Sequence, residues 1–250
     1  MIYVCIPAHD EAATIGVLLW KTRKVLNEFG RDFRLVVHDD ASIDDTAQVL
    51  ERYVRTLPLT VLRSEQRIGY GRSVEALLRH VQAEAPYPKR DAAVVMQGDF
   101  TEDPRDVVSL VKIIEGGADI VAGNRARNGA PQPRGVKAVR WLTRTILRGK
   151  LAGAPVSDPL GGMRAYRVIV LKKALRERTE PLIRSDGWAA NVELLGQLIP
   201  HARRISEVEL EPRYDLRMRP SRFRPVRTLL SVARLRGSLP AAVPGVEAAT

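Results

Sequence analysis

Residues 94–104 read VVMQGDFTEDP, and this stretch indicates how the chain folds. A β-branched apolar run reaches Gly98, and Asp99 follows at the point where a buried strand would end. In an open parallel sheet, ligands bind at the carboxyl ends of the strands. A carboxylate at such an end suits a hard divalent cation, which can in turn hold phosphate groups. The stretch therefore predicts a site for a metal ion and a diphosphate, with Asp99 as its firm ligand.

Acidic residues also follow other predicted strands of the N-terminal half. Apolar runs with strand character alternate with helical patterns, which indicates βαβ units and a parallel sheet. Right-handed crossovers place the carboxyl ends of such strands on one edge. We expect strands at 2–7, 33–38, 60–63, 92–97 and 119–122, and we expect these acidic residues to share one edge: Asp10, Glu11, Asp39, Asp40 and Asp99.

The second half is less regular, with expected helices at 137–151 and 188–199 and a strand at 203–211. The pattern predicts an α/β protein with a single domain, in which helices flank a mostly parallel central sheet. We expect this domain to span residues 1–212. A basic C-terminal extension, 213–237, and a disordered tail, 238–250, would follow.

Composition narrows the classes of function. The 250 residues carry a formal net charge of +11, and such a surface attracts nucleic acid, anionic membranes or phosphate-bearing substrates. Aromatic residues are only 5%, without a zinc-finger or aromatic RNA-binding motif, so we expect no nucleic-acid partner. The single cysteine, Cys5, permits no internal disulfide. With no apolar run of roughly 18 residues and no signal peptide, a cytoplasmic protein is expected.

Two common nucleotide-binding folds lack their motifs here. A dinucleotide-binding fold needs a glycine-rich turn after its first strand, but residues 7–11 read PAHDE, whose carboxylates would repel a pyrophosphate. The P-loop motif G-x-x-x-x-G-K-[ST] is absent. What remains is a nucleotide held partly through a metal, with carboxylates accepting hydrogen bonds from the base or ribose.

The chain resembles the family 2 glycosyltransferases with the GT-A fold, nearest to the polyprenyl-phosphate (dolichyl-phosphate) mannose synthase-like branch. The resemblance spans roughly residues 2–215. The matching stretches stand in the family's order: IPAHDE (6–11), VVHDDASID (36–44), Gly69 and Gly71, QGD (97–99), GNR (123–125) and DPLGGMR (158–164).

This resemblance implies a nucleotide-sugar donor and a divalent metal, Mg²⁺ or Mn²⁺. The metal would lie at Gln97 and Asp99, the positions of the family's Asp-x-Asp motif. By motif position, the implied donor-binding residues are Pro7, His9, Glu11, Asp39, Asp40, Gly69, Gln97 and Gly98, with Asp40 on the base. Arg125 and Arg164 fall in motifs that shape the donor and acceptor phosphate side, and Arg164 is also a catalytic candidate.

The sequence departs from the family at several of these positions. Gln97 replaces the first aspartate of the metal motif, so it can ligate through its carbonyl oxygen but adds no charge, and metal affinity should fall. Tyr70 stands where the family often has lysine, Asp10 where asparagine is usual, and Ala41 where glycine is usual.

The acceptor decides which residues would catalyse transfer. A hydroxyl acceptor needs a general base, for which Asp158, Asp186 and Glu193 are candidates. A lipid phosphate is already anionic, and Arg125, Arg140 and Arg144 would then hold it, because arginine suits bidentate phosphate contacts. Both alternatives remain open. Structural roles for Asp158 and Glu193, in a turn or in an ion pair, are the competing interpretation.

The arginine-rich segment 213–236 contains apolar residues interleaved with arginine, as in a basic surface helix. It could lie on the inner face of an anionic membrane and meet a lipid acceptor, or it could contact a second subunit in a homo-oligomer. The sequence thus predicts an inverting hexosyltransferase using a GDP- or UDP-sugar, with polyprenyl phosphate as a candidate acceptor. The alternative is a degenerate glycosyltransferase-like protein that binds the nucleotide sugar without turnover; a nucleotide-sugar pyrophosphorylase ranks last.

Overall fold

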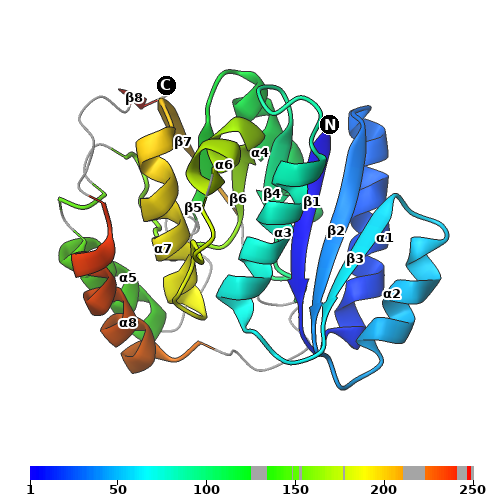
Figure 1. The fold of residues 1–250 in the computed structure, drawn as a ribbon, viewed down its shortest axis with the longest axis horizontal. Coiled ribbons are helices and arrows are strands. Elements are labelled where there is room, and N and C mark those ends of the chain that lie inside the picture. Colours follow the sequence, from blue (N-terminus) through cyan, green and yellow to red (C-terminus); the bar gives the residue numbers. More distant parts are fainter. Residues whose placement is uncertain are drawn as a thin grey trace.

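The computed structural model describes residues 1–124, 134–147, 149–151, 154–176, 178–210, 223–240 and 247–248. Within these residues the strands form one sheet of order β3-β2-β1-β4-β6-β5-β7-β8. The strands are β1 (Ile2–Ala8), β2 (Phe33–Asp40), β3 (Leu59–Ser64), β4 (Ala92–Val95), β5 (Ile120–Asn124), β6 (Arg164–Arg167), β7 (Arg204–Glu209) and β8 (Glu247–Ala248). Figure 1 shows helices on both faces of this sheet.

The helices are α1 (Ala12–Phe29), α2 (Thr46–Val54), α3 (Tyr70–Glu84), α4 (Pro104–Glu115), α5 (Arg134–Ile146), α6 (Val168–Leu175), α7 (Trp188–Leu198) and α8 (Pro225–Ser238), with a short 3₁₀ turn, η1 (Ile199–His201). Helix α6 was not predicted, and α5 begins earlier and ends earlier than the expected helix at 137–151. In the part of the chain that the structure describes, none of the helices has the length and apolar character of a membrane span.

The sheet is mostly parallel, which confirms the predicted fold class. Strand β1 pairs in parallel with β2 and β4, and β5 pairs in parallel with β7. Strand β6 lies antiparallel between β4 and β5. The register aligns Ala8 with Asp39 and Cys5 with Val95, so β1, β2 and β4 end on the same edge of the sheet. This edge is where the acidic residues were expected.

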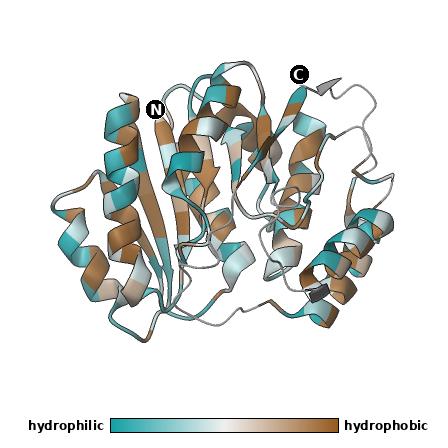
Figure 2. Ribbon diagram, turned by 180° about the vertical axis from the view of Figure 1, so that it is seen from behind, coloured by the Kyte–Doolittle hydropathy of each residue, from teal (hydrophilic) through white to brown (hydrophobic). Residues whose placement is uncertain are grey.

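Alternation along the strands divides the core between the two faces of the sheet. In β1, Tyr3 and Cys5 pack with α3, α6 and α7, whereas Val4 and Ile6 pack with α1 and α4 on the other face. Figure 2 shows the strands as the hydrophobic centre of the molecule. Burial raises the pKa of the Cys5 thiol, which packs in the core as a small hydrophobic side chain.

A third, smaller apolar cluster joins α5, α7 and α8. Val139 of α5, Val192 of α7 and Val232 of α8 are buried in it together with Leu235. Helix α8, which lies in the segment expected to be an extension, is therefore packed into the domain. Within the expected disordered tail, Glu247 and Ala248 instead pair with β7. Residues 213–222 and 241–246 lie outside the described residues.

Asp103 caps α4, as its position before Pro104 predicts. Its Oδ1 accepts a hydrogen bond from the Arg105 amide at 3.0 Å, and its Oδ2 accepts one from Lys21 Nζ at 3.0 Å. Burial alone would raise the pKa of Asp103, but the hydrogen bonds from Arg105 and Lys21 outweigh it and hold the pKa below its ordinary value. The ionised carboxylate is thus the form that stabilises the fold.

We expect Asp103→Ala to lower the free energy of unfolding by about 1 kcal/mol at pH 7, because the helix loses its cap. A carboxyl with a lowered pKa in the folded state stabilises fully above its unfolded pKa of about 3.9 and loses this contribution as pH falls toward its folded pKa. The difference between the variant and the unmodified protein should therefore shrink between pH 5 and pH 3. Urea unfolding of both proteins at pH 5 and pH 3 measures this difference in the free energy of unfolding. A difference that is the same at both pH values would contradict the role of the ionised Asp103 carboxylate.

Candidate active site

A cavity of about 720 Å³ opens at the carboxyl edge of β1, β2 and β4. It contains six of the residues predicted to bind the donor: Pro7, His9, Glu11, Asp40, Gln97 and Gly98. Its remaining walls come from the start of α3, the turn before α7 and the first turns of α8. The cavity is therefore built from segments that are distant in the sequence and close only in the fold.

The backbone is strained at each of the three strand ends that form this edge. Asp10, Ala41 and Phe100 adopt left-handed conformations, with φ of 53°, 50° and 62°, although none of them is glycine. Hydrogen bonds join Asp10 to the residues that follow Ala41, because the Asp10 amide donates to Ser42 Oγ at 3.0 Å and Asp10 Oδ1 accepts from the Ile43 amide at 3.0 Å. Strain of this kind clusters at functional sites, where the surrounding structure maintains it.

Asp40 lines the cavity and also fixes the turn before α3. Its carboxylate accepts hydrogen bonds from the amides of Ile68 at 2.6 Å and Gly69 at 2.9 Å. Its backbone carbonyl lies 2.8 Å from His9 Nδ1. Asp40 is placed to meet a nucleoside, but much of its hydrogen-bonding capacity is already used by the protein.

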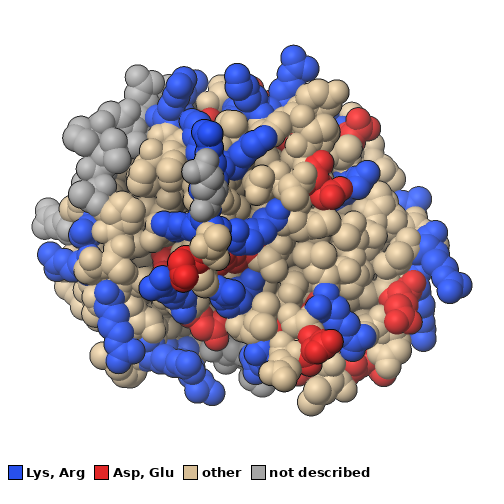
Figure 3. Space-filling model, in the orientation of Figure 1, with Lys and Arg blue, Asp and Glu red and all other residues tan. Residues whose placement is uncertain are grey.

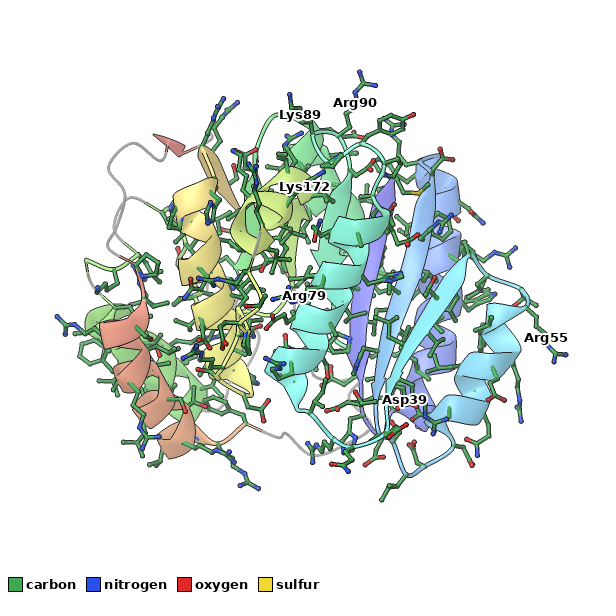
Figure 4. The ribbon with its side chains drawn as sticks, viewed as in Figure 1. Asp39, Arg55, Arg79, Lys89, Arg90 and Lys172 are labelled. Atoms are coloured by element: carbon green, nitrogen blue, oxygen red, sulfur yellow. The ribbon has the colours of Figure 1, made fainter. Side chains whose placement is uncertain are left out.

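Asp39 does not line the cavity. Its side chain is fully buried, accepts a hydrogen bond from the Ser42 amide at 3.0 Å and lies 3.5 Å from Arg63 Nε. Figure 4 shows Asp39 at the carboxyl end of β2. Asp39 therefore supports the loop behind Asp40, and its predicted contact with the donor stays a prediction. Gly69 is likewise a neighbour of the cavity wall and not part of it.

The predicted metal positions differ in exposure. Gln97 lines the cavity, whereas Asp99 is 1% exposed and its Oδ1 accepts hydrogen bonds from the Thr101 hydroxyl at 2.6 Å and the Thr101 amide at 3.2 Å. Within the described ranges, no group of three or more His, Cys, Asp or Glu side chains is arranged to hold a metal ion. One carboxylate and one amide fit Mg²⁺ or Mn²⁺ only if substrate phosphates complete the shell.

Of the catalytic candidates, Asp186 lines the cavity, whereas Arg164 and Glu193 do not. Arg164 is 1% exposed and donates hydrogen bonds to the backbone carbonyls of Pro159 and Asn191, so it braces the 158–164 turn. Glu193 accepts hydrogen bonds from two backbone amides, those of Arg184 and Ser185. Both side chains are buried by structural partners, and their catalytic role stays a prediction.

Of the predicted phosphate-binding arginines, Arg140 and Arg144 do not line the cavity. Arg140 is 6% exposed and its Nη2 lies 3.0 Å from Oδ2 of Asp158, which is 1% exposed, so the two form a buried ion pair. This pair agrees with the structural interpretation of Asp158, and its role as a base stays a prediction. Arg144 is exposed on α5 and does not line the cavity. Arg125 lies outside the described residues.

Several residues that line the cavity were not in the predicted donor set. Four of them are Arg224, the N-cap residue of α8, and Arg227, Thr228 and Ser231 within α8, and their spacing places them on one helical face. This helical spacing is the sequence pattern from which these residues could have been predicted to share one surface. Arg67, Tyr70, Ser73, Asp186, Gly187 and Trp188 complete the wall.

A polar floor lies where Tyr70 meets the 158–164 turn. The Tyr70 hydroxyl donates to Asn191 Oδ1 at 2.9 Å. A Cβ added at Gly162 would lie 3.0 Å from Gln97 Nε2 and 3.1 Å from the Tyr70 hydroxyl. A side chain at position 162 would therefore crowd Gln97 and Tyr70, which both line the cavity.

The residues that line the cavity include both acidic and basic side chains. Glu11, Asp40 and Asp186 supply carboxylates, which accept hydrogen bonds from hydroxyl and N–H groups. Arg67, Arg224 and Arg227 supply guanidinium groups, which bind phosphate oxygens. Such a site can bind a ligand that has both hydrogen-bond donors and phosphates.

Comparison with protein families now places the chain. The model of Glycosyl transferase family 2 matches residues 3–175. The chain belongs to glycosyl transferase family 2. The family match covers β1 to α6, and the residues of the cavity wall from Asp186 to Ser231 follow the matched span.

Among curated members related to this family 2 chain are undecaprenyl-phosphate 4-deoxy-4-formamido-L-arabinose transferases. That of Pseudomonas aeruginosa (strain LESB58) is 26% identical over 194 residues, which are 76% of this chain and 54% of the relative. That of Pseudomonas syringae pv. syringae (strain B728a) is 24% identical over 207 residues, 80% of this chain and 58% of the relative. The chain thus spans little more than half the length of these relatives.

Solved structures share the fold. Glucosyl-3-phosphoglycerate synthase from Mycobacterium tuberculosis, in complex with Mn²⁺, uridine diphosphate (UDP) and glucosyl-3-phosphoglycerate, superposes with a TM-score of 0.64 at 24% identity, over 96% of this chain and 81% of that one. S. aureus TarS 1-349, in complex with UDP-GlcNAc, gives a TM-score of 0.59 at 21% identity, over 95% and 65% of the two chains. The likeness confirms the GT-A fold of this family 2 chain.

Proposed function

We propose that the chain transfers a sugar from a GDP- or UDP-linked donor to a polyprenyl phosphate, with inversion at the sugar. The observation that carries this proposal is the cavity, in which carboxylates and arginines lie together at the carboxyl edge of the sheet. UDP is present in the M. tuberculosis relative, and the names of the curated relatives specify undecaprenyl phosphate as their acceptor. These likenesses support the choice of substrates.

Different lining residues suit the nucleoside and the diphosphate of the donor. The nucleoside would lie at the ends of β1 and β2, between His9, Asp40 and Arg67, and the diphosphate would extend toward Gln97 and the arginines of α8. Negative charge grows on the diphosphate as the sugar leaves. Arg224 and Arg227, together with the N-terminus of α8, would stabilise that charge.

Transfer to a phosphate needs no strong general base, because the attacking oxygen is already ionised. This oxygen forms the new bond to the anomeric carbon as the bond from that carbon to the diphosphate breaks on the opposite side. The sugar is thereby inverted and the nucleoside diphosphate departs. Asp99 and Gln97 would hold Mg²⁺ or Mn²⁺ beside the diphosphate, and a bound cation would neutralise charge on the leaving group.

Calorimetric titration with UDP and GDP, each with and without Mn²⁺, tests the donor site. Transfer is tested by incubating the protein with nucleotide sugars and undecaprenyl phosphate and analysing the lipid product. We expect one nucleotide to bind and a glycosylated lipid to form. No binding of either nucleotide under both conditions would refute the proposal.

Nucleotide binding without transfer would support the second candidate, a degenerate family member that binds the nucleotide sugar without turnover. The replacement of the first metal-binding aspartate by Gln97, together with the burial of Asp99, favours this candidate. The lipid product therefore distinguishes the two functions.

Asp99→Ala tests the metal position separately. We expect the variant to lose most of the gain in nucleotide affinity that Mn²⁺ provides, because the remaining protein ligand, Gln97, carries no charge. Binding without Mn²⁺ should change little, since Asp99 does not line the cavity. If Mn²⁺ raises the nucleotide affinity of the variant as much as that of the unmodified protein, the metal lies elsewhere.

We also propose that the pair of α5 and α8 contacts the inner, cytoplasmic face of the membrane. Trp141 of α5 is 67% exposed, and Val226 and Leu230 of α8 are 71% and 56% exposed. Figure 3 shows Lys and Arg side chains gathered over these two helices, at the lower left. Apolar side chains within a basic surface suit an anionic bilayer.

The double variant Trp141→Ser, Leu230→Gln should sediment less with anionic vesicles, because it loses the apolar side chains that would enter the bilayer. Trp20→Ser is the matched control, since Trp20 is 53% exposed on α1 and should not affect binding. Deleting the C-terminal segment is not a suitable test, because α8 is part of the core. Equal sedimentation of the two variants would refute membrane contact by this surface.

A further inference from the structure

The segment 182–186, between α6 and α7, is held by two buried carboxylates. Glu75 of α3 accepts hydrogen bonds from the amides of Leu182 and Ile183, both at 2.9 Å. Glu193 of α7 accepts hydrogen bonds from the amides of Arg184 at 2.9 Å and Ser185 at 2.7 Å. Two helices thus fix consecutive backbone amides of one short segment.

Each carboxylate is 4% exposed, so its desolvation is costly and is offset by these hydrogen bonds. Glu75 is further paired with Arg79, whose Nε lies 2.8 Å from Oε1. Figure 4 places Arg79 on the side of α3 that faces α7. The segment also lies directly against the first turn of α3, because a Cβ at Gly71 would be 2.3 Å from the Ser185 carbonyl oxygen. These contacts leave the segment little freedom.

The residue that this segment presents to the cavity is Asp186. Its side chain is exposed and lines the cavity, and its Oδ1 accepts a long hydrogen bond, 3.4 Å, from the Gly71 amide. The carboxylate lies against Gly69, where an added Cβ would be 2.9 Å from Oδ1. Gly69 is also the residue whose amide donates to Asp40. Asp186 and Asp40 therefore flank the same glycine at the proposed nucleoside end of the cavity.

The two carboxylates differ in what they already bind. Both oxygens of Asp40 accept short hydrogen bonds from backbone amides, at 2.6 and 2.9 Å, whereas the hydrogen bond to Asp186 is long. A carboxylate only accepts hydrogen bonds, so its natural partner in a ligand is a hydroxyl or N–H group. Asp186 retains more of this capacity for a ligand than Asp40 does.

We propose that Asp186 receives a hydroxyl or N–H group of the bound nucleoside and that Glu75 and Glu193 are the positioning residues that hold it there. This proposal rests on the nucleotide donor proposed above and adds a donor-binding residue that follows the family-matched span. It requires the segment 182–186 to act as a fixed part of the cavity wall.

Calorimetric titration of the full chain with UDP and with GDP tests the contact. Asp186→Asn removes a negative charge, and that change alone would strengthen binding of a diphosphate anion. We expect the opposite, a decrease in affinity of about tenfold or more for the nucleotide that the unmodified protein binds, because a hydrogen bond to a charged group is lost. The direction of the change therefore separates the proposed contact from a general effect of charge.

Glu193→Gln tests the positioning role. We expect it to lower nucleotide affinity as Asp186→Asn does and to have little further effect when the two changes are combined. Asp119→Asn is the matched control, because Asp119 also accepts a backbone hydrogen bond, from the Arg203 amide at 2.8 Å, but does so away from the cavity. The control should lose stability without losing affinity.

Deoxy nucleotides identify the group that Asp186 binds. If the partner is a ribose hydroxyl, 2′,3′-dideoxy-UDP or -GDP should bind equally to the unmodified protein and to Asp186→Asn; if it is an N–H of the base, the difference should persist. Unchanged or increased affinity of Asp186→Asn for a nucleotide that the unmodified protein binds would overturn this proposal alone. Failure of the unmodified protein to bind UDP or GDP would overturn the donor proposal and this one with it.

Discussion

Arg140→Ala is expected to lower the free energy of unfolding by about 3–5 kcal/mol, because it leaves a buried carboxylate without its cation. Arg140 Nη2 lies 3.0 Å from Asp158 Oδ2, and the two residues are 6% and 1% exposed. Asp158→Ala should cost a similar amount. Domains of this kind are stable by only about 5–15 kcal/mol, so either change should be visible as a large loss of folded protein on warming.

The double variant Arg140→Ala, Asp158→Ala should be less destabilised than the sum of the single variants, because neither buried charge is then left alone. Urea unfolding of the four proteins gives this coupling. The exposed pair of Arg31 and Glu115, 2.9 Å apart, serves as a control, and Arg31→Ala should cost less than about 1 kcal/mol. If the losses in unfolding free energy from the two single changes add up in the double variant, Arg140 and Asp158 do not form a buried ion pair. Retained nucleotide affinity in the folded Arg140 variant would agree with its position away from the cavity.

Gly71→Ala should impair both stability and nucleotide binding, although alanine is normally the better residue in a helix. The added Cβ would lie 2.3 Å from the Ser185 carbonyl oxygen and 2.9 Å from Ala190 Cβ and Ile183 Cγ2. The nearest of these atoms is a backbone oxygen, which cannot rotate away as a flexible side chain could, so we expect a loss of about 1–3 kcal/mol. The displaced segment carries Asp186, and nucleotide affinity should fall with it.

Gly237→Ala is the control for the helix effect. Gly237 lies in α8, and a Cβ there would meet nothing within 4 Å, so this variant should be stabilised by up to about 1 kcal/mol. Thermal unfolding and UDP or GDP titration of both variants measure the two effects. Equal stabilisation of the two variants would show that the first turn of α3 and the Ser185 carbonyl are not in contact.

Local sequence patterns predicted the strand ends of the cavity well. Pro7, Asp40 and Gln97 directly follow or end apolar runs, and the rule that parallel strands share a carboxyl edge brings them together without further information. The capping role of Asp103 was likewise a local inference, since a carboxylate before Pro104 starts a helix.

Sequence reasoning failed where the partner of a residue lies in an irregular segment. Glu193 appears in its sequence as a lone acid in an apolar helix, and nothing local indicates that the amides of residues 184 and 185 turn back to meet it. Asp186 was named only as one of three candidates for a general base, and its contact with Gly71, which spans 115 positions of sequence, could not be foreseen. The direction of β6 and the packing of α8 depend on such long-range contacts too.

Helix α8 has a consequence for how the cavity opens. Its buried side chains join a small cluster with α5 and α7, separate from the two clusters that pack on the sheet. Detachment of α8 should therefore cost less than global unfolding and occur as a local event. A nucleotide that contacts Arg224 and Arg227 binds only the attached form, so saturation would suppress the detachment by mass action. Slower amide hydrogen exchange in α8 would thus report occupancy of the cavity.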